Sequence, residues 1–208
     1  MKIPFAKPLI GKKEILLVNK VLKSGILTHG PYSKKFENEF SNFSGVKNVI
    51  AISSCTSALL TAYYLSGLDK NSEFIVPAQT HVATVHAGTF LGAKPVFVDC
   101  EEDTGNINVD LIEKKITKKT KAITVVHYLG KPVKIYKILQ LCRKYNLKLI
   151  EDCALALGAK YNNKHVGSLA DFACFSFYPA KHIATGDGGI LMCKNKGDLH
   201  KAKLFKGF

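Results

Sequence analysis

Short runs rich in β-branched and apolar residues alternate with helical stretches along the first 150 or so residues of this 208-residue chain. Such alternation is typical of a mostly parallel sheet, because each return to the same edge of the sheet needs a crossover, usually a helix. The sequence therefore predicts an α/β fold with a mostly parallel sheet flanked by helices. Strands are expected at 49–53, 73–76, 94–99, 122–126 and 147–150, and helices at 56–66, 82–91, 109–116 and 133–145.

The alternation of strands and helices ends after residue 152. Shorter β segments are expected near 159–161, 171–177 and 189–193. The first thirty residues predict a helix and an arm rich in glycine and proline. We therefore divide the chain into an N-terminal helix and arm (1–30) and one large domain (31–208). A chain of this length can hold one large domain, or one domain and a fragment of a second.

Composition narrows the class of protein. A hydrophobic content of 47% with 22% charged residues is ordinary for a globular protein. No apolar run approaches the roughly 18–20 residues of a membrane span, and the start of the chain has no apolar core of a signal peptide, so we expect a cytoplasmic protein. The 6 cysteines are scattered without a C-x-x-C pair, which favours reduced thiols. His81 and His86 lack the spacing of a helical zinc pair, so no metal site is expected.

The net charge of +14 raises the question of nucleic-acid binding. Arg143 is the only arginine, however, and arginine is the commonest reader of base edges. The lysines are spread along the chain. A solvated, lysine-rich surface is therefore favoured over a nucleic-acid interface, and the charge would also attract a phosphorylated substrate.

Lys181 is the most informative single residue. An apolar, β-prone stretch (172–177) leads into the turn that carries this lysine, and a glycine-rich segment (186–189) follows at once. A lysine amine removed from water loses part of its preference for the charged form and can act as a nucleophile. A neutral lysine amine is what Schiff-base chemistry on a carbonyl cofactor requires. The alternative is that Lys181 is an ordinary surface lysine.

Groups at the ends of the predicted strands support the first interpretation. In open α/β sheets, ligands bind at the carboxyl ends of the strands, which places residues 54–57, 79–81, 127–130 and 151–152 along one rim. Small hydroxylated residues at 53–57 open a helix whose N-terminus suits a phosphate, although a simple helix cap would look the same. Asp152 could face a cationic ring nitrogen, or serve as a cap or structural ion pair.

An anion-binding helix start, a carboxylate at the rim and a lysine in a turn form a coherent set. Pyridoxal 5′-phosphate (PLP) needs a phosphate site, a partner for its pyridine nitrogen and a lysine for its Schiff base. The sequence therefore predicts PLP as the cofactor.

Ordered motifs over nearly the whole chain extend this pattern. They are GP at 30–31, FE at 36–37, SCTSAL at 54–59, VPAQTHVAT at 76–84, GAKPVFVD at 92–99, EDCA at 151–154 and SFYPAKHIATGDGG at 176–189. With these motifs in this order, the chain resembles the DegT/DnrJ/EryC1/StrS family of sugar aminotransferases, a branch of the fold-type I PLP enzymes.

The resemblance implies the fold of the large domain of those enzymes, a homodimer with shared active sites, and PLP as cofactor. It implies a nucleotide-linked keto-sugar as the substrate and an amino acid such as glutamate as the amino donor. It also implies a role for each of these site residues: Lys181 forms the Schiff base and moves the proton, Asp152 pairs with the pyridine nitrogen, Thr56, Ser57 and Ser176 hold the phosphate, and His81 stacks on the cofactor.

Two departures from the family pattern matter. Many members carry Gln or His at the position of Leu155, near the ring hydroxyl of the cofactor. Members also continue into a smaller C-terminal domain, so we expect this chain to hold the large domain alone.

Two other functions stay open. Related PLP-dependent sugar 3-dehydratases share the motif around residues 177–180 but replace the lysine by histidine, so Lys181 favours transamination. A non-catalytic remnant of the fold is the other alternative. Leu155 favours it, whereas Lys181, Asp152 and Ser176 oppose it.

Overall fold

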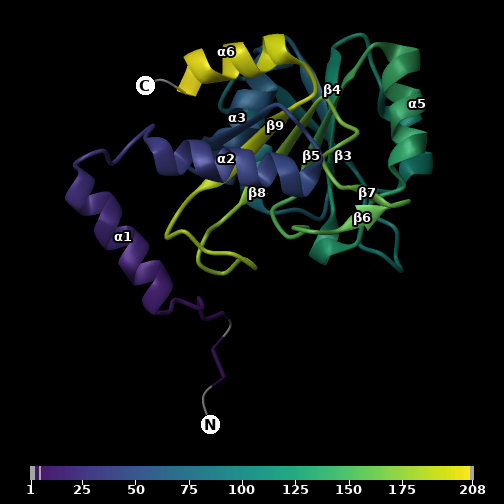
Figure 1. Ribbon diagram of the computed structural model, residues 1–208. Coiled ribbons are helices and arrows are strands. Elements are labelled where there is room, and N and C mark those ends of the chain that lie inside the picture. The colour runs from purple at the N-terminus through teal and green to yellow at the C-terminus, as the bar shows by residue number, and fades with distance from the viewer. Residues whose placement is uncertain (1–2, 5, 207–208) are drawn as a thin grey trace.

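The computed structural model describes residues 3–4 and 6–206, and its centre is a seven-stranded sheet (Figure 1). The strands lie in the order β1-β9-β8-β5-β4-β2-β3, and every neighbouring pair is parallel except the two that involve β9. The prediction of a mostly parallel sheet is confirmed. Its strands are β1 (Val49–Ile52), β2 (Glu73–Pro77), β3 (Lys94–Val98), β4 (Thr120–Val126), β5 (Lys148–Asp152), β8 (Phe172–Ser176) and β9 (Gly189–Cys193).

Helices cover both faces of this sheet. One face packs against α3 (Cys55–Leu65), α4 (Val82–Thr89) and α6 (Lys196–Lys206). The other face packs against α2 (Pro31–Ser44) and α5 (Ile135–Tyr145). This two-sided cover explains why the strands read as almost continuous apolar runs.

Successive residues of a strand point to opposite faces. In β2, Phe74 and Val76 pack beneath α3 and α4, whereas Ile75 packs on the side of α5. The same alternation at the end of β5 sends Asp152 toward α4 and Glu151 toward the opposite face. Two adjacent carboxylates therefore have unrelated surroundings.

The predicted helix at 109–116 is wrong. The segment forms two short 3₁₀ turns, η1 (Val109–Leu111) and η2 (Glu113–Lys115). Side chains three residues apart are aligned in a 3₁₀ helix, and this alignment lets Val109 and Ile112 both pack into the core.

Helices α2 and α6 were not predicted. In α2, Phe36, Phe40 and Phe43 recur at helical spacing, and Phe40 is buried against Phe175 and Phe177 of the sheet region. The hairpin of β6 (Lys160–Tyr161) and β7 (Lys164–His165) realises the β segment expected near 159–161.

The expected N-terminal helix is α1 (Lys12–Ser24), which projects from the body of the molecule (Figure 1). It has no buried residue, and most of its apolar side chains, among them Leu16, Val18 and Leu22, are exposed. Within the part of the chain that the structure describes, no helix is both long enough and apolar enough to span a bilayer. The division of the chain at residue 30 stays a prediction.

Candidate active site

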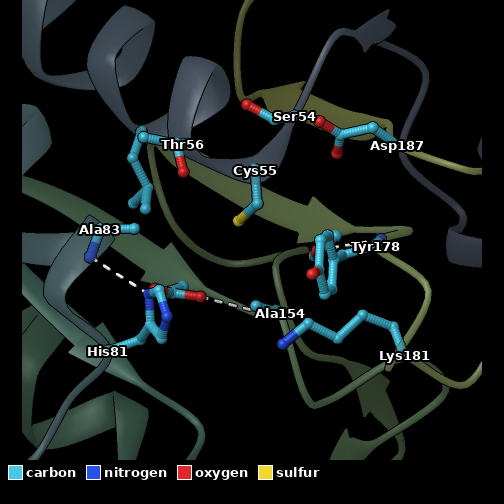
Figure 2. Close-up of a pocket in the computed structure, with 12 residues that line it drawn as sticks. Ser54, Cys55, Thr56, His81, Ala83, Ala154, Tyr178, Lys181 and Asp187 are labelled. Carbon is cyan, nitrogen blue, oxygen red and sulfur yellow. Dashed lines mark hydrogen bonds between the residues drawn. The ribbon is translucent and has the colours of Figure 1, made fainter. Parts of the chain in front are cut away.

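A cavity of about 490 Å³ lies at the carboxyl edge of the sheet, where α3 and α4 begin (Figure 2). The loop between β8 and β9 forms another wall. The cavity is lined by Ser54, Cys55, Thr56, Leu59, His81, Ala83, Asp152, Ala154, Ser176, Tyr178, Lys181 and Asp187.

This lining brings together the predicted residues Thr56, His81, Asp152, Ser176 and Lys181 from four separate segments. Ser57 is the exception. It lines a neighbouring cavity of about 300 Å³, and its hydroxyl hydrogen-bonds with those of Ser53 and Ser54.

The start of α3 is built to receive an anion. Ser54 is the N-cap, and its Oγ accepts a hydrogen bond from the Ser57 backbone N–H at 3.1 Å. The cap satisfies that one donor, but the N–H groups of Cys55 and Thr56 have no acceptor within the helix. Together with the helix dipole, they favour a bound phosphate or carboxylate.

Gly189, at the start of β9, allows the helix start to approach the sheet closely. A Cβ at this position would lie 2.5 Å from the Ser54 carbonyl carbon and 2.7 Å from the Cys55 nitrogen. Only glycine leaves room for this contact. The glycine-rich segment therefore seats the anion-binding turn against the sheet.

Asp152 ends β5 and is 5% exposed. Its Oδ1 accepts from the Ala154 backbone N–H at 3.0 Å and its Oδ2 accepts from the Thr84 hydroxyl at 2.8 Å. Burial raises the pKa of Asp152 above its ordinary value of 3.8, while the two hydrogen bonds and the charge of Lys181 oppose the rise. A cation placed beside this carboxylate would lower its pKa and be held strongly.

Lys181 lies in the loop between β8 and β9, and its half-buried side chain extends into the cavity (Figure 2). The loop is closed at its base by hydrogen bonds from the Phe177 N–H to the Gly188 carbonyl at 2.9 Å and from the Thr185 N–H to the Phe177 carbonyl at 3.0 Å. The Lys181 N–H donates to the Tyr178 carbonyl at 2.8 Å. These bonds fix the point from which the amine reaches inward.

His81 lines the cavity and also caps α4. Its Nδ1 accepts from the Ala83 backbone N–H at 3.2 Å, so in the neutral ring the hydrogen is on Nε2 (Figure 2). The imidazole is exposed to solvent. The cap fixes the orientation of the ring, whichever role the ring has toward a ligand.

Several residues around the site were missed from the sequence. Tyr178 and Asp187 flank Lys181 in the chain, so their place in the same loop could have been inferred. Leu155 does not line the cavity. The Cys55 thiol does, but burial and the charge of Asp152 raise its pKa well above the ordinary range. It is therefore a neutral wall of the cavity rather than a nucleophile.

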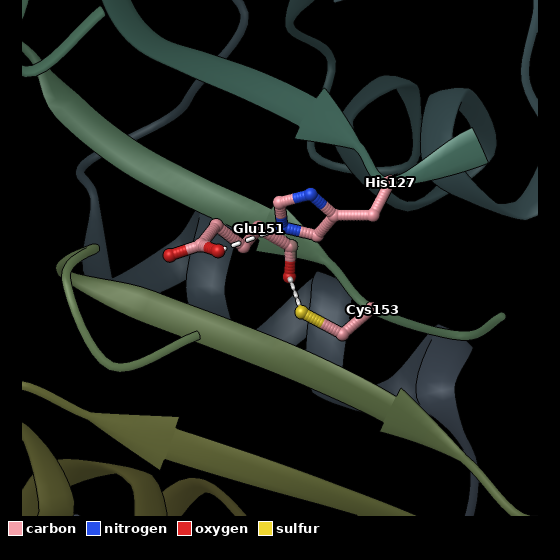
Figure 3. A group of neighbouring side chains, drawn as sticks. All are labelled: His127, Glu151 and Cys153. Carbon is pink, nitrogen blue, oxygen red and sulfur yellow. Dashed lines mark hydrogen bonds and ion pairs between the residues drawn. The ribbon is translucent and has the colours of Figure 1, made fainter. Parts of the chain in front are cut away.

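A second polar cluster joins His127, Glu151 and Cys153 (Figure 3). All are buried on the opposite face of the sheet, so the expectation that His127 and Glu151 lie on the cavity rim is wrong. The His127 Nδ1 accepts from the Val133 N–H at 3.1 Å, so its Nε2 carries the hydrogen and donates to Glu151 at 2.7 Å.

The remaining hydrogen bonds of this cluster indicate a structural role. Glu151 also accepts from the backbone N–H groups of Gly167 at 2.7 Å and Ala170 at 3.2 Å. Every ligating atom of the histidine and the carboxylate is thus engaged in a hydrogen bond. The cluster clamps the segment before β8 onto β5 and needs no ion to satisfy its charge.

The residues of the cavity fit PLP. The N–H groups at the start of α3 suit its phosphate, buried Asp152 suits its protonated ring nitrogen, and Lys181 suits its carbonyl carbon. Gly189 lets the start of α3, which carries these N–H groups, lie directly against β9.

The fold and this set of groups resemble those of PLP-dependent enzymes, and comparison with known proteins identifies the family. A model of the DegT/DnrJ/EryC1/StrS aminotransferase family matches residues 8–208, and the chain belongs to this family.

Particular relatives give the match more detail. The chain is 41% identical to GDP-perosamine synthase of Escherichia coli O157:H7, over 99% of this chain and 57% of that protein. An aminotransferase structure from Psychrobacter cryohalolentis is 35% identical, with a TM-score of 0.94 over 98% of this chain and 53% of that one. A GDP-4-keto-6-deoxymannose-3-dehydratase structure with a trapped PLP-glutamate geminal diamine is 29% identical, with a TM-score of 0.90 over 97% of this chain and 54% of that one. The chain thus spans about half the length of these relatives.

Proposed function

We propose that this chain is the cofactor-binding part of a PLP-dependent sugar aminotransferase, acting as a cytoplasmic homodimer. The enzyme transfers the amino group of an amino acid, glutamate in the simplest case, to a nucleotide-linked keto-sugar. The observation that supports this most strongly is the shared cavity of Lys181, Asp152 and the start of α3. Sequence similarity to a GDP-perosamine synthase supports a nucleotide-linked sugar as the substrate.

Each residue has a proposed task. When bound, PLP supplies an electron sink for the carbon that carries the amine. Lys181 would hold the cofactor covalently while no substrate is bound, and its amine, once the substrate amine has displaced it, would move the proton between the substrate carbon and the cofactor carbon that exchange the amine. Asp152 accepts the hydrogen bond of the pyridine N–H and keeps that nitrogen protonated. The Thr56 N–H and the Ser176 hydroxyl bind the phosphate, and the His81 ring packs on the cofactor.

Ser57 has an indirect part in this proposal. Its backbone N–H donates to the Ser54 cap and its hydroxyl hydrogen-bonds with the hydroxyls of Ser53 and Ser54. It would steady the turn whose N–H groups meet the phosphate. A direct contact would require its hydroxyl to turn from the neighbouring cavity.

The similarity to a sugar 3-dehydratase means that the fold alone does not distinguish the two reactions. Lys181 favours transamination, because a retained lysine can complete the amine transfer. The sugar product separates the two: transamination leaves an amino-sugar, whereas dehydration removes a sugar hydroxyl.

The first test is covalent capture of the cofactor. We predict that purified chain mixed with PLP becomes yellow, and that borohydride fixes the cofactor to the peptide containing Lys181. Lys181→Ala should abolish this labelling. Lys194→Ala, at an exposed lysine just beyond β9, serves as the control and should keep it. Labelling at another lysine, with Lys181→Ala still labelled, would contradict the assignment.

A further inference from the structure

Asp152 stands at the end of a short chain of hydroxyl groups. The Thr84 Oγ1 lies 2.8 Å from the Asp152 Oδ2, and the Thr80 Oγ1 lies 2.7 Å from the Thr84 Oγ1. Thr84 is fully buried, whereas Thr80 is half-buried and precedes His81, which lines the cavity.

Counting protons sets the direction of these bonds. A hydroxyl has one hydrogen to donate. When Asp152 is ionised, Thr84 must donate its hydrogen to the carboxylate, and its contact with Thr80 must then have Thr80 as the donor. The order is Thr80 to Thr84 to Asp152, and consecutive bonds of this kind polarise and strengthen one another.

The position of the Thr84 hydroxyl is fixed by its own backbone. Its carbonyl accepts from the Tyr63 hydroxyl at 2.9 Å, and Tyr63 accepts from the Thr124 hydroxyl at 2.9 Å. Tyr63 and Thr124 are both fully buried. The first turn of α4 is therefore tied through α3 to β4, the strand that pairs with β5.

The bond to Thr84 also has no substitute among the described residues. The other hydrogen bond to the Asp152 carboxylate reaches Oδ1, not Oδ2.

The ionisable groups near Asp152 are Lys181, His127, Tyr63 and the thiols of Cys55, Cys153 and Cys174. Burial raises the pKa values of Tyr63 and the thiols, which keeps them neutral while Asp152 titrates.

We propose that Thr84 is a positioning residue for Asp152. Its hydroxyl, itself hydrogen-bonded by Thr80, orients the carboxylate and favours its ionised form, which is the form that a protonated pyridine nitrogen requires. The link to the pyridine rests on the proposed function; the link between Thr84 and the charge of Asp152 does not.

The test is a titration of the unliganded chain. Aspartate labelled with ¹³C at the carboxyl carbon reports ionisation by NMR, and Asp152→Asn identifies the signal of Asp152. In Thr84→Val the acid dissociation constant of Asp152 should fall by about tenfold, the effect of losing one hydrogen bond to a charged group. Thr84→Ser restores the hydroxyl and should restore the titration.

Thr124→Val is the matched control. It removes an equally buried threonine hydroxyl from the same hydrogen-bonded set but does not touch Asp152. It should destabilise the fold without moving the titration. An unchanged titration in Thr84→Val, or an equal shift in Thr124→Val, would overturn the proposal.

A measurement that needs no Thr84 variant covers the case in which Thr84→Val does not fold. The buried hydroxyl proton of Thr84 should be visible by NMR and should shift with the same midpoint as the Asp152 carbon. A hydroxyl signal that ignores the ionisation of Asp152 refutes the link. Because neither measurement needs the cofactor, both give an answer even if the chain fails to bind PLP.

Discussion

At the scale of single residues, Asp152 shows a conflict between stability and function. Its burial favours the neutral acid, whereas the proposed chemistry needs the ion. Because the folded pKa is raised, its contribution to stability is fully present below the unfolded value of 3.8 and is lost as pH rises through the folded pKa. In the unliganded chain, an ionised Asp152 therefore lowers the free energy of unfolding at neutral pH.

We predict that Asp152→Asn raises the Tm of the unliganded chain at pH 7 and lowers the activity of the complete enzyme by about 100-fold or more. Asn keeps the shape: its oxygen can accept from the Ala154 N–H, and its NH₂ can donate to Thr84. Thermal unfolding followed across pH checks the first part, and the gain should disappear at pH 3.8 and below. Single-turnover rates check the second, and unchanged rates would mean that another residue faces the pyridine nitrogen.

At the scale of elements, the site depends on how closely β9 approaches the start of α3. Gly189 pairs with Ile52 of β1 on one side and with Ser176 of β8 on the other. It thus sits where two strands end at the cavity. Its lack of a side chain lets the Ser54–Cys55 peptide lie on the sheet.

We predict that Gly189→Ala destabilises the fold by about 1–3 kcal/mol, the usual cost of overpacking. We also expect the substitution to weaken PLP binding. The added methyl group must push the anion-binding turn away from β9. Denaturant unfolding and PLP titration measure the two effects. Gly197→Ala, in α6, is the control because its nearest contact would be an ordinary 3.4 Å, and it should leave PLP binding unchanged. Equal PLP affinity in Gly189→Ala and the unsubstituted chain would contradict this account.

Much of the element pattern could be predicted from local sequence. Runs such as that of β4 have few conformations open to them besides a buried strand, and the phosphate turn follows directly from the end of β1. The short turns η1 and η2 could not be distinguished from a helix, because Val109 and Ile112 fit either spacing. Helix α2 was missed although Phe36, Phe40 and Phe43 recur at helical spacing, whereas the packing of Phe40 against the sheet depends on the fold.

Site residues could be predicted only where the neighbouring sequence carries a signal for them. Lys181 and Asp152 each stand beside a strand end, which sequence can suggest. The bond from Thr84 joins residues 68 positions apart and depends on how α4 packs against β5. The opposite orientations of Glu151 and Asp152 follow from strand geometry, but which of them meets the cavity depends on the fold.

At the scale of the whole molecule, the cavity has cofactor groups but is open to water. Thr56, His81 and Asp187 line it and are exposed. Helix α1 likewise presents Leu16 and Leu22 to solvent. The relatives it matches are about twice as long as this chain, and in the family a further domain is expected to cover the substrate.

We predict that residues 1–208 alone take up PLP but transaminate at least about 100-fold more slowly than a chain extended to the length of its relatives. The groups proposed to hold the cofactor are all in this chain, whereas substrate positioning and exclusion of water need further walls around the cavity. The extension can be taken from the segment that follows the matched region in the E. coli GDP-perosamine synthase. Both proteins are assayed with a keto-sugar nucleotide and glutamate, by formation of 2-oxoglutarate. Rates are divided by the PLP content measured from absorbance, so that incomplete loading is not mistaken for slow chemistry. Equal turnover per loaded site would contradict the prediction and mean that the 208-residue chain holds a complete site.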